Sequence, residues 1–391
     1  MQSGIKLGRL FGIRIILDWS WLVILFLVTW NLAGSYFPSM HPDWSPGLRW
    51  GTGLAASLLF FVSILAHELA HSLAAKASGL EVHQIRLFLF GGVSNIEREP
   101  ATPKADFWIS FVGPLTSFLL GAAFLGAGLL GLERPGSDFN PILVLAQMDP
   151  FQTLLFWLGP VNLLLAVFNL IPGFPLDGGR VLRSVIWAVT RNFSLATQWA
   201  ARFGQVVAWL FILAGFAMVF GFNVPLLGRG AVGGIWLAFI GWFLNNAASQ
   251  SYQQSVITDM LEGVPVSRLM KTDSQFVDAR LTIDAVVDQF MLGSDERTFP
   301  VIAGDRLAGF LSRADVRNLN REQWPSVTAA DIMTPLEQVE VVYPDEDVSE
   351  ALRKLSQSKA SQLPVMEQGR LIGVLSQQDI IRWLQLQTER Q

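Results

Sequence analysis

Cysteine is missing from this chain, and charged residues are scarce. With no cysteine among 391 residues, neither a disulfide framework nor a thiolate metal site can form, so any metal must be held by His, Asp or Glu. Only 15% of the residues are charged, whereas 51% are hydrophobic and the mean hydropathy is +0.40. Soluble domains carry about 25% charged residues. The composition therefore predicts a membrane protein for most of the length.

Positive charge is also lacking as a concentrated feature. The formal net charge is −4, and the lysines and arginines are scattered rather than gathered into a stripe. A nucleic-acid-binding surface needs such a stripe, so we exclude nucleic acid as a partner.

Long apolar windows are abundant. Six of them have about 18 to 25 residues, the length needed to cross about 30 Å of hydrocarbon. They lie near residues 16–36, 52–75, 107–132, 152–172, 203–222 and 231–248. No small-residue cleavage site follows the first window, so we expect a retained helix rather than a signal peptide. More basic residues lie before the first window, between the second and third, and between the fourth and fifth than in the alternate connections. The positive-inside rule therefore assigns these three segments to the cytoplasm.

The sequence predicts two domains. Residues 1–250 form a polytopic α-helical membrane domain, and residues 251–391 form a soluble α/β tail with ordinary charge density. In the tail, residues 298–317 align without gaps on residues 362–381 at an offset of 64. Two copies of one small unit are expected at about 264–322 and 327–386, because a unit this short gains a core only by pairing.

The motif HELAH in the second apolar window carries the clearest chemistry. On a helix, His67 and His71 lie one turn apart on one face, so both imidazoles can converge on one ion with Glu68 beside it. Zinc activates water near neutral pH, and a neighbouring carboxylate can take the proton. Ionisable groups cost several kcal/mol inside hydrocarbon, so a purely structural use of these three residues is disfavoured.

A third ligand is expected from the end of the fourth window. Asp177 lies in FNLIPGFPLDGGR, between two prolines and two glycines, where regular helix must break. Asp before Gly is also an ordinary turn residue. However, broken backbone at membrane depth requires protein or a watery cavity around it, and Asp177 approaches the depth of HELAH, which favours the ligand interpretation.

Together, HELAH and NLIPGFPLDGGR closely resemble the motifs of the site-2 protease family of intramembrane zinc metalloproteases. The resemblance covers roughly residues 1–250. It implies one Zn²⁺ per chain held by His67, His71 and Asp177, with Glu68 as the general base and Asn169 as a group that positions or stabilises the scissile carbonyl.

Two further segments fit the resemblance. Residues 83–97 alternate and then break at Gly91 and Gly92, which predicts a β-hairpin; in the family a comparable membrane-associated element offers a strand edge to an unwound substrate, so Gly91 and Gly92 are candidate substrate-binding residues. The segment FVGPLTS (111–117) resembles a Gly-Pro motif of the family, with Ser117 where Asn is expected. Close helix packing through small residues is the favoured interpretation of this segment.

The repeated tail resembles a pair of CBS domains. Ser312, Asp315, Ser376 and Asp379 match positions that commonly contact the ribose and phosphates of an adenine nucleotide, ATP or AMP, in such pairs. Ser-x-x-Asp is also a helix-capping arrangement, so both interpretations stay open. Such pairs often associate with each other, which makes a homodimer through the tail one expectation.

We therefore expect a zinc endopeptidase of a bacterial or archaeal inner membrane, with both termini and the tail in the cytoplasm. Its substrates would be transmembrane segments of other proteins in the lipid bilayer, and its tail would adjust activity with nucleotide state. The alternative is a CBS-regulated transporter or channel. Transporters often show inverted repeats, and the membrane half has no such symmetry.

Overall fold

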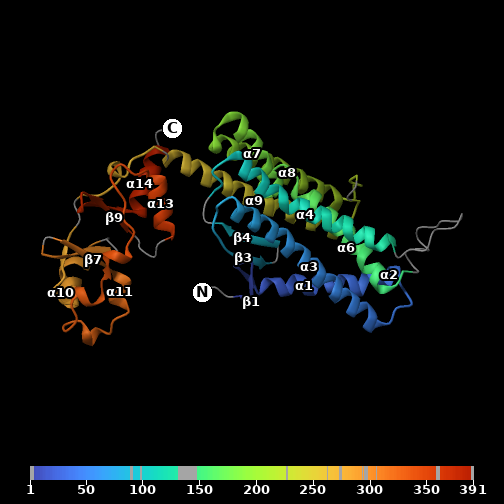
Figure 1. The fold of residues 1–391 in the computed structure, drawn as a ribbon, viewed down its shortest axis with the longest axis horizontal. Coiled ribbons are helices and arrows are strands. Elements are labelled where there is room, and N and C mark those ends of the chain that lie inside the picture. The colour runs from blue at the N-terminus through green and yellow to red at the C-terminus, as the bar shows by residue number, and fades with distance from the viewer. Residues whose placement is uncertain are drawn as a thin grey trace. The chain divides into compact units, whose positions relative to one another are not determined.

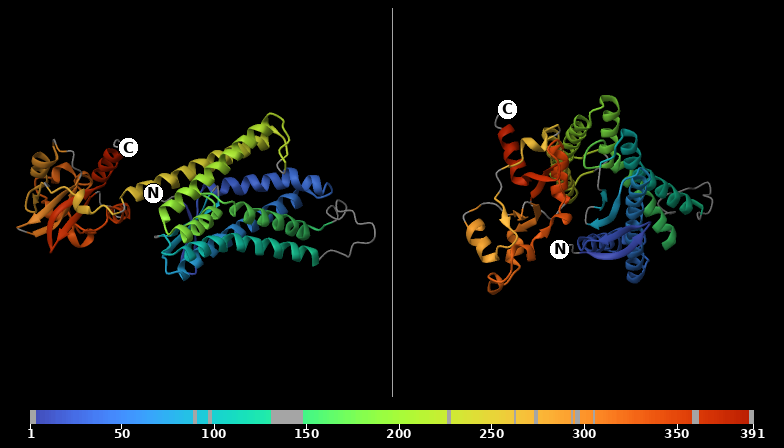
Figure 2. Two further views of the ribbon diagram at one scale, coloured as in Figure 1. Left: turned by 90° about the horizontal axis from the view of Figure 1, so that it is seen from above. Right: turned by 60° about the vertical axis from the view of Figure 1, so that its left-hand side comes forward.

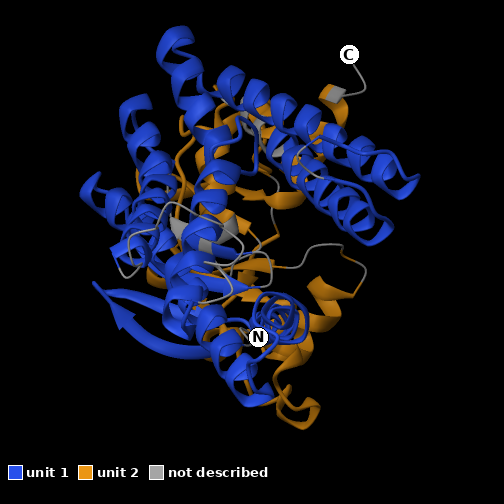
Figure 3. Ribbon diagram, turned by 90° about the vertical axis from the view of Figure 1, so that its right-hand side faces the viewer, with its two compact units in different colours: residues 1–255 blue, residues 256–391 orange. Residues whose placement is uncertain are grey.

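The computed structural model covers residues 1–391 and divides into two compact units, unit 1 (1–255) and unit 2 (256–391) (Figure 3). The sequence-based boundary lies at 250/251. The residues that the structure describes are 4–88, 91–96, 99–130, 148–225, 228–261, 263–272, 275–292, 294, 298–304, 306–357 and 362–388.

Unit 1 is built mainly of long apolar helices that lie side by side (Figures 1 and 2). Within the described residues, six helical segments are long and apolar enough to cross a membrane, which confirms the expected polytopic fold. Five of these segments are α3, α4, α6, α8 and the first part of α9, and the sixth combines α1, a π-helical turn and α2. The helices are α1 (Ser20–Asn31), α2 (Phe37–Met40), α3 (Pro46–Ala77), α4 (Pro103–Leu130), α6 (Pro150–Asn169), α7 (Asp177–Thr190), α8 (Phe193–Val219) and α9 (Ala231–Leu261).

A four-stranded sheet lies beside these helices, in the order β1-β2-β3-β4. Its strands are β1 (Ile5–Leu10), β2 (Ile13–Leu17), β3 (Val82–Phe88) and β4 (Gly91–Ile96). Strands β3 and β4 form the expected antiparallel hairpin, and β2 pairs with β3 in parallel. Inward-facing residues of the sheet, including Ile13 and Ile85, pack against Phe61 of α3 and Ile109 of α4.

The expected start of the first helix, near residue 16, is wrong. Residues 5–17 form the antiparallel hairpin β1-β2 instead, turning at Phe11 and Gly12, which both have positive φ. The first apolar window includes Ile16 and Leu17, the last two residues of β2, which are buried in the sheet together with Ile13 and Ile15. Helix α1 begins at Ser20, where Asp18 Oδ1 accepts hydrogen bonds from the Ser20 amide and hydroxyl.

Small residues bring α4 and α6 close together. A Cβ on Gly121 of α4 would lie 2.9 Å from the Gly159 carbonyl oxygen, and a Cβ on Gly159 would lie 2.5 Å from Leu125 Cγ. Membrane helices associate through such van der Waals packing because lipid tails are as apolar as their side chains. Helix α4 also packs along α3 and α7, so it lies at the centre of the helices described below.

Unit 2 contains two similar halves. One half has the sheet β5-β6-β7-β8 and the other has the hairpin β10-β9. The hairpins β6-β7 and β9-β10 have the same bounds after a shift of 64 residues, as the sequence repeat predicts. The strands are β5 (Val277–Asp278), β6 (Thr298–Ala303), β7 (Arg306–Ser312), β8 (Thr334–Pro335), β9 (Gln362–Glu367) and β10 (Arg370–Ser376), and the helices are α10 (Ile283–Val286), α11 (Arg313–Arg317), α12 (Ala329–Ile332), α13 (Val348–Gln357) and α14 (Gln377–Thr388).

Candidate metal centre

Helix α3 presents both histidines of HELAH on one buried face. Ser45 caps the helix by accepting a hydrogen bond from the Leu48 amide, and the helix then continues without a break to Ala77. His67 and His71 are 4% and 6% exposed, and their Nε2 atoms lie 3.1 Å apart. The i, i+4 spacing therefore places two nitrogen donors at one point inside the apolar unit.

Asp177 reaches the same point from a distant part of the chain. The chain leaves α6 at Asn169 and enters α7 at Asp177, which is the first residue of that helix. Asp177 Oδ2 lies 3.0 Å from His67 Nε2 and 3.2 Å from His71 Nε2. Within the described part of the chain, these three residues form the one cluster of His, Asp or Glu donors arranged to hold a metal ion.

Helix α4 fixes the orientation of both imidazoles. The Ile109 carbonyl oxygen lies 2.5 Å from His71 Nδ1, and Ser117 Oγ lies 2.8 Å from His67 Nδ1. A carbonyl oxygen can only accept, so Nδ1 of His71 donates, and in the neutral ring Nε2 keeps its lone pair for a metal. Metal-binding histidines usually have such a partner on the other ring nitrogen.

Gly113 of α4 leaves open the space in front of the two nitrogens. A Cβ at this position would lie 2.1 Å from His71 Nε2 and 2.8 Å from His67 Nε2. The segment 111–117 was interpreted from the sequence as a site of close helix packing. The structure places its Gly113 and Ser117 directly against the histidines.

The donor set fits zinc. Two imidazole nitrogens and one carboxylate oxygen are typical ligands of this ion, and a tetrahedron with bonds of about 2.0 Å has edges of about 3.3 Å. The three separations among the donor atoms are 3.0, 3.1 and 3.2 Å. Three protein ligands leave a fourth position open, which is the pattern of catalytic rather than structural zinc.

Strand β4 lies against Glu68. Ser94 Oγ donates a hydrogen bond of 3.2 Å to Glu68 Oε2 and lies 3.0 Å from Ser72 Oγ on the next turn of α3. A Cβ on Gly92 would lie 2.3 Å from Glu68 Cγ, so the absence of a side chain at Gly92 allows this close approach. Gly91 and Gly92 are the first two residues of β4, an edge strand of the sheet.

The remaining predicted site residues lie elsewhere. Asn169 is the last residue of α6, partly buried, and precedes the broken segment that leads to Asp177. In unit 2, Ser312 and Asp315 form a capping box at the start of α11. Ser376 and Asp379 make the equivalent contacts at the start of α14, where Lys271 Nζ lies 3.3 Å from Asp379 Oδ1. The capping interpretation of both pairs is therefore confirmed, and nucleotide contact stays a prediction.

Four contacts around the histidines and Glu68 were missed by sequence reasoning. They are made by Gly113, Ser117, the Ile109 carbonyl and Ser94. The only signal for the first two was the resemblance of FVGPLTS to a motif of the family. A backbone carbonyl leaves no trace in the sequence, and Ser94 is one serine among many.

A multi-pass membrane unit that joins an HExxH helix to a distant aspartate defines the class of membrane zinc metalloproteases. The family model "Peptidase family M50" matches residues 55–215, and the model "CBS domain" matches residues 329–386. The chain belongs to peptidase family M50, the site-2 protease type of zinc metalloendopeptidase, and carries a CBS tail.

Relatives resemble the chain over nearly its whole length. One is "Putative zinc metalloprotease sll0528" of Synechocystis sp., which is 35% identical over 388 residues that cover 98% of this chain and 96% of the relative. Rip3 of Mycobacterium tuberculosis is 33% identical over 384 residues, with coverage of 98% and 93%. Among solved structures, the site-2 protease from Methanocaldococcus jannaschii aligns at 26% identity with a TM-score of 0.41 and covers 64% of this chain and 95% of that one. With this family shown, we set aside the transporter or channel alternative.

Proposed function

We propose that the protein is an intramembrane endopeptidase that cuts transmembrane segments of other membrane proteins. The observation that carries the proposal is the convergence of His67, His71 and Asp177 on one buried point inside a unit of membrane-spanning helices. Polar and ionisable groups inside the membrane cost free energy. A metal site at that depth is therefore useful only if the peptide bond to be cut also lies inside the membrane.

We assign the roles at the centre as follows. His67, His71 and Asp177 hold one zinc ion per chain. When bound, zinc supplies Lewis-acid polarisation of the peptide carbonyl and activates water near neutral pH. Glu68 takes a proton from the attacking water as the new C–O bond forms and then gives it to the amide nitrogen, so that the C–N bond breaks and the amine leaves. Asn169 is assigned to positioning or stabilising the carbonyl being cut.

Strand β4 is the proposed binding edge for the substrate. A peptide bond in a helix is shielded by its own hydrogen bonds, so the substrate must unwind before cleavage. The edge of β4 offers unpaired backbone groups that can pair with an extended segment. Gly92 and Ser94 of this strand contact Glu68, so a peptide added at β4 would lie close to the general base.

The positive-inside pattern supports the orientation that we assign. The chain lies in a bacterial or archaeal inner membrane, with the metal centre near its cytoplasmic side and with both termini and the tail in the cytoplasm.

Unit 2 binds ATP or AMP at Ser312 and Asp315 and at Ser376 and Asp379. Nucleotide binding there adjusts the access of substrate to the metal centre or the assembly of the protein, including a homodimer through the tail. Loss of adenine-nucleotide binding in Asp315→Ala with Asp379→Ala, measured by calorimetry, tests the assignment.

Replacing Glu68 by glutamine tests the mechanism. The amide keeps the size of the side chain but accepts no proton, so cleavage of a transmembrane substrate should fall at least about 100-fold, the lower range for general acid–base catalysis. Zinc should stay at one ion per chain in Glu68→Gln and be lost in His67→Ala and Asp177→Ala. Glu81→Gln is the matched control, because that side chain is 74% exposed beyond the end of α3. Undiminished cleavage by purified Glu68→Gln would refute the mechanism.

A further inference from the structure

Helix α4 provides none of the three donor side chains, yet it contacts the elements that carry all of them. It holds His71 through the Ile109 carbonyl and His67 through Ser117. Its third link leads to α7, the helix that begins with Asp177. This link is made by Asp106, one turn before Ile109, and by Arg183, which lies six residues after Asp177.

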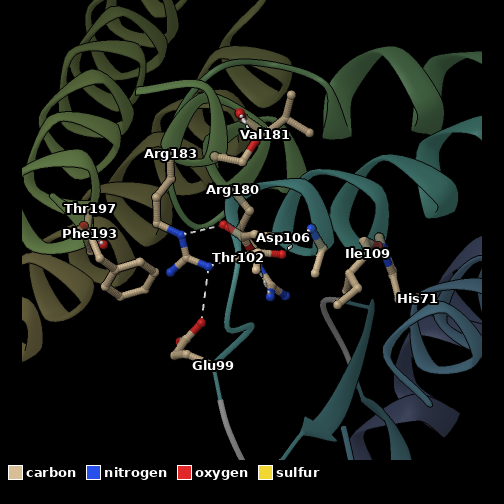
Figure 4. Close-up of polar contacts among 12 residues, drawn as sticks. His71, Glu99, Thr102, Asp106, Ile109, Arg180, Val181, Arg183, Phe193 and Thr197 are labelled. Carbon is tan, nitrogen blue, oxygen red and sulfur yellow. Dashed lines mark hydrogen bonds and ion pairs between the residues drawn. The ribbon is translucent and has the colours of Figure 1, made fainter. Parts of the chain in front are cut away.

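The link is a buried, two-pronged ion pair (Figure 4). Arg183 Nε donates to Asp106 Oδ2 at 2.9 Å, and a terminal nitrogen of Arg183 donates to Asp106 Oδ1 at 2.7 Å. Asp106 is fully buried and Arg183 is 4% exposed. Arg180 adds a longer contact of 3.4 Å to Asp106, and Glu99 accepts from Arg183 at 3.2 Å. Two carboxylates therefore face two guanidinium groups, and the cluster is neutral.

The guanidinium group of Arg183 also lies over two aromatic rings. Its central carbon lies 4.6 Å from the centre of the Phe193 ring and 5.5 Å from the centre of the Phe174 ring. A planar group fixed by a bidentate carboxylate and by aromatic rings has little freedom to rotate. Because Arg183 lies on the same short helix as Asp177, about 9 Å along its axis, the pair restricts both the rotation and the position of that carboxylate.

Stability alone is a weak explanation for such a pair. Removing two charges from water is costly, and apolar residues of similar volume often replace a buried ion pair without loss of stability. A bidentate pair does, however, specify one relative geometry of two helices. The donor atoms at the centre are 3.0 to 3.2 Å apart, and a metal site tolerates errors of only about 0.5 Å.

We propose that Asp106 and Arg183 are positioning residues, and that they fix Asp177 relative to the two histidines by tying α7 to α4. In this arrangement, α4 is the common support of the metal centre, because every ligand is oriented through it. The inference rests on the proposed function, since it assumes that His67, His71 and Asp177 bind the metal.

The test replaces the pair by apolar residues in the double variant Asp106→Leu with Arg183→Met. The full-length protein should still fold, and its metal-free thermal unfolding should stay close to wild type. Zinc affinity, measured by competition with a chelator, should fall by up to about 10-fold to 100-fold, the loss that is typical when a group bonded directly to a metal ligand is removed. The visible absorption spectrum of the cobalt-loaded protein should change, because it reports the geometry of the ligands.

A control removes another ion pair, a partly exposed lysine–glutamate pair far away in sequence. Lys354 and Glu346 of unit 2 also form an ion pair, and Glu346→Leu with Lys354→Met should leave zinc affinity and the cobalt spectrum unchanged. If Asp106→Leu with Arg183→Met fails to fold, Arg183→Lys decides, because it keeps the charge and loses the two-pronged geometry.

The outcomes separate the two proposals. A folded Asp106→Leu/Arg183→Met or Arg183→Lys protein with wild-type zinc affinity and an unchanged cobalt spectrum would overturn the positioning role and leave the protease proposal intact. A wild type that binds no zinc would overturn the proposed function itself, and the positioning role with it.

Discussion

Replacing Gly113 by alanine adds one methyl group where α4 faces the two imidazoles. That carbon would lie 2.1 Å from His71 Nε2 and 2.8 Å from His67 Nε2, well inside van der Waals contact. Without metal, the imidazoles can turn away from the methyl group by giving up their Nδ1 contacts to Ile109 and Ser117, so the loss of stability should be smaller than the loss of metal affinity. With metal, they cannot, because both Nε2 atoms must face the ion.

The penalty should therefore appear in metal affinity. Overpacking a tight site by one methyl group costs about 1–3 kcal/mol. Since about 1.4 kcal/mol corresponds to a factor of ten, zinc should bind about 5-fold to 150-fold more weakly, with a parallel loss of cleavage at limiting zinc. Chelator competition measures the affinity, and thermal unfolding of the metal-free protein measures stability.

Gly126→Ala is the matched control on the same helix. No atom lies within 4 Å of a Cβ at Gly126, so the substitution has the same effect on helix propensity and no contact with the histidines. If Gly113→Ala binds zinc as tightly as Gly126→Ala, then the histidine nitrogens do not face α4 in the metal-bound protein, and the site described above is incorrect.

Three further predictions concern the same centre. Ser117→Ala removes the partner of His67 Nδ1 and should weaken zinc binding about 10-fold to 100-fold; unchanged affinity by chelator competition would contradict the proposed orientation. Gly92→Ala places a carbon 2.3 Å from Glu68 Cγ and so displaces the general base. Cleavage should fall while the zinc content stays at one ion per chain. Loss of zinc would instead show that the substitution disrupts the metal ligands. Removal of zinc by a chelator should abolish cleavage. It should also lower the thermal midpoint of wild type, because a ligand that binds only the native state stabilises that state. Restored zinc should reverse both changes, and activity that survives in zinc-free protein would refute the metal mechanism.

Local sequence patterns predicted the parts of the centre that depend on local geometry. The spacing of His67 and His71 fixes their common face on any helix, and the two prolines before Asp177 indicate the break between α6 and α7. The contacts made by α4 depend on tertiary packing, and Ser117 lies 50 residues from His67. Asp106 and Arg183 are single charged residues 77 positions apart, and no periodicity links them.

The N-terminal strands show a different limit of sequence reasoning. Strand β2 is apolar at nearly every position because its side chains are buried in the sheet and against helices. A short buried strand cannot be distinguished from the start of an apolar helix by hydropathy alone. Strands β3 and β4 were predictable because Gly91 and Gly92 separate an alternating run from its neighbour.

The parallel pairing of β2 with β3 sets an order of events during biosynthesis. Leu17 pairs with Leu87, so about 70 residues, including α1 and α3, are synthesised between the two partners. At about 5–20 residues per second, this interval lasts about 4–14 s. Until β3 has been made, the edge of β2 that pairs with it has no strand partner. The rate of synthesis and the insertion of two helical segments, as well as the final packing, therefore set the time at which the sheet and its edge strand β4 can form.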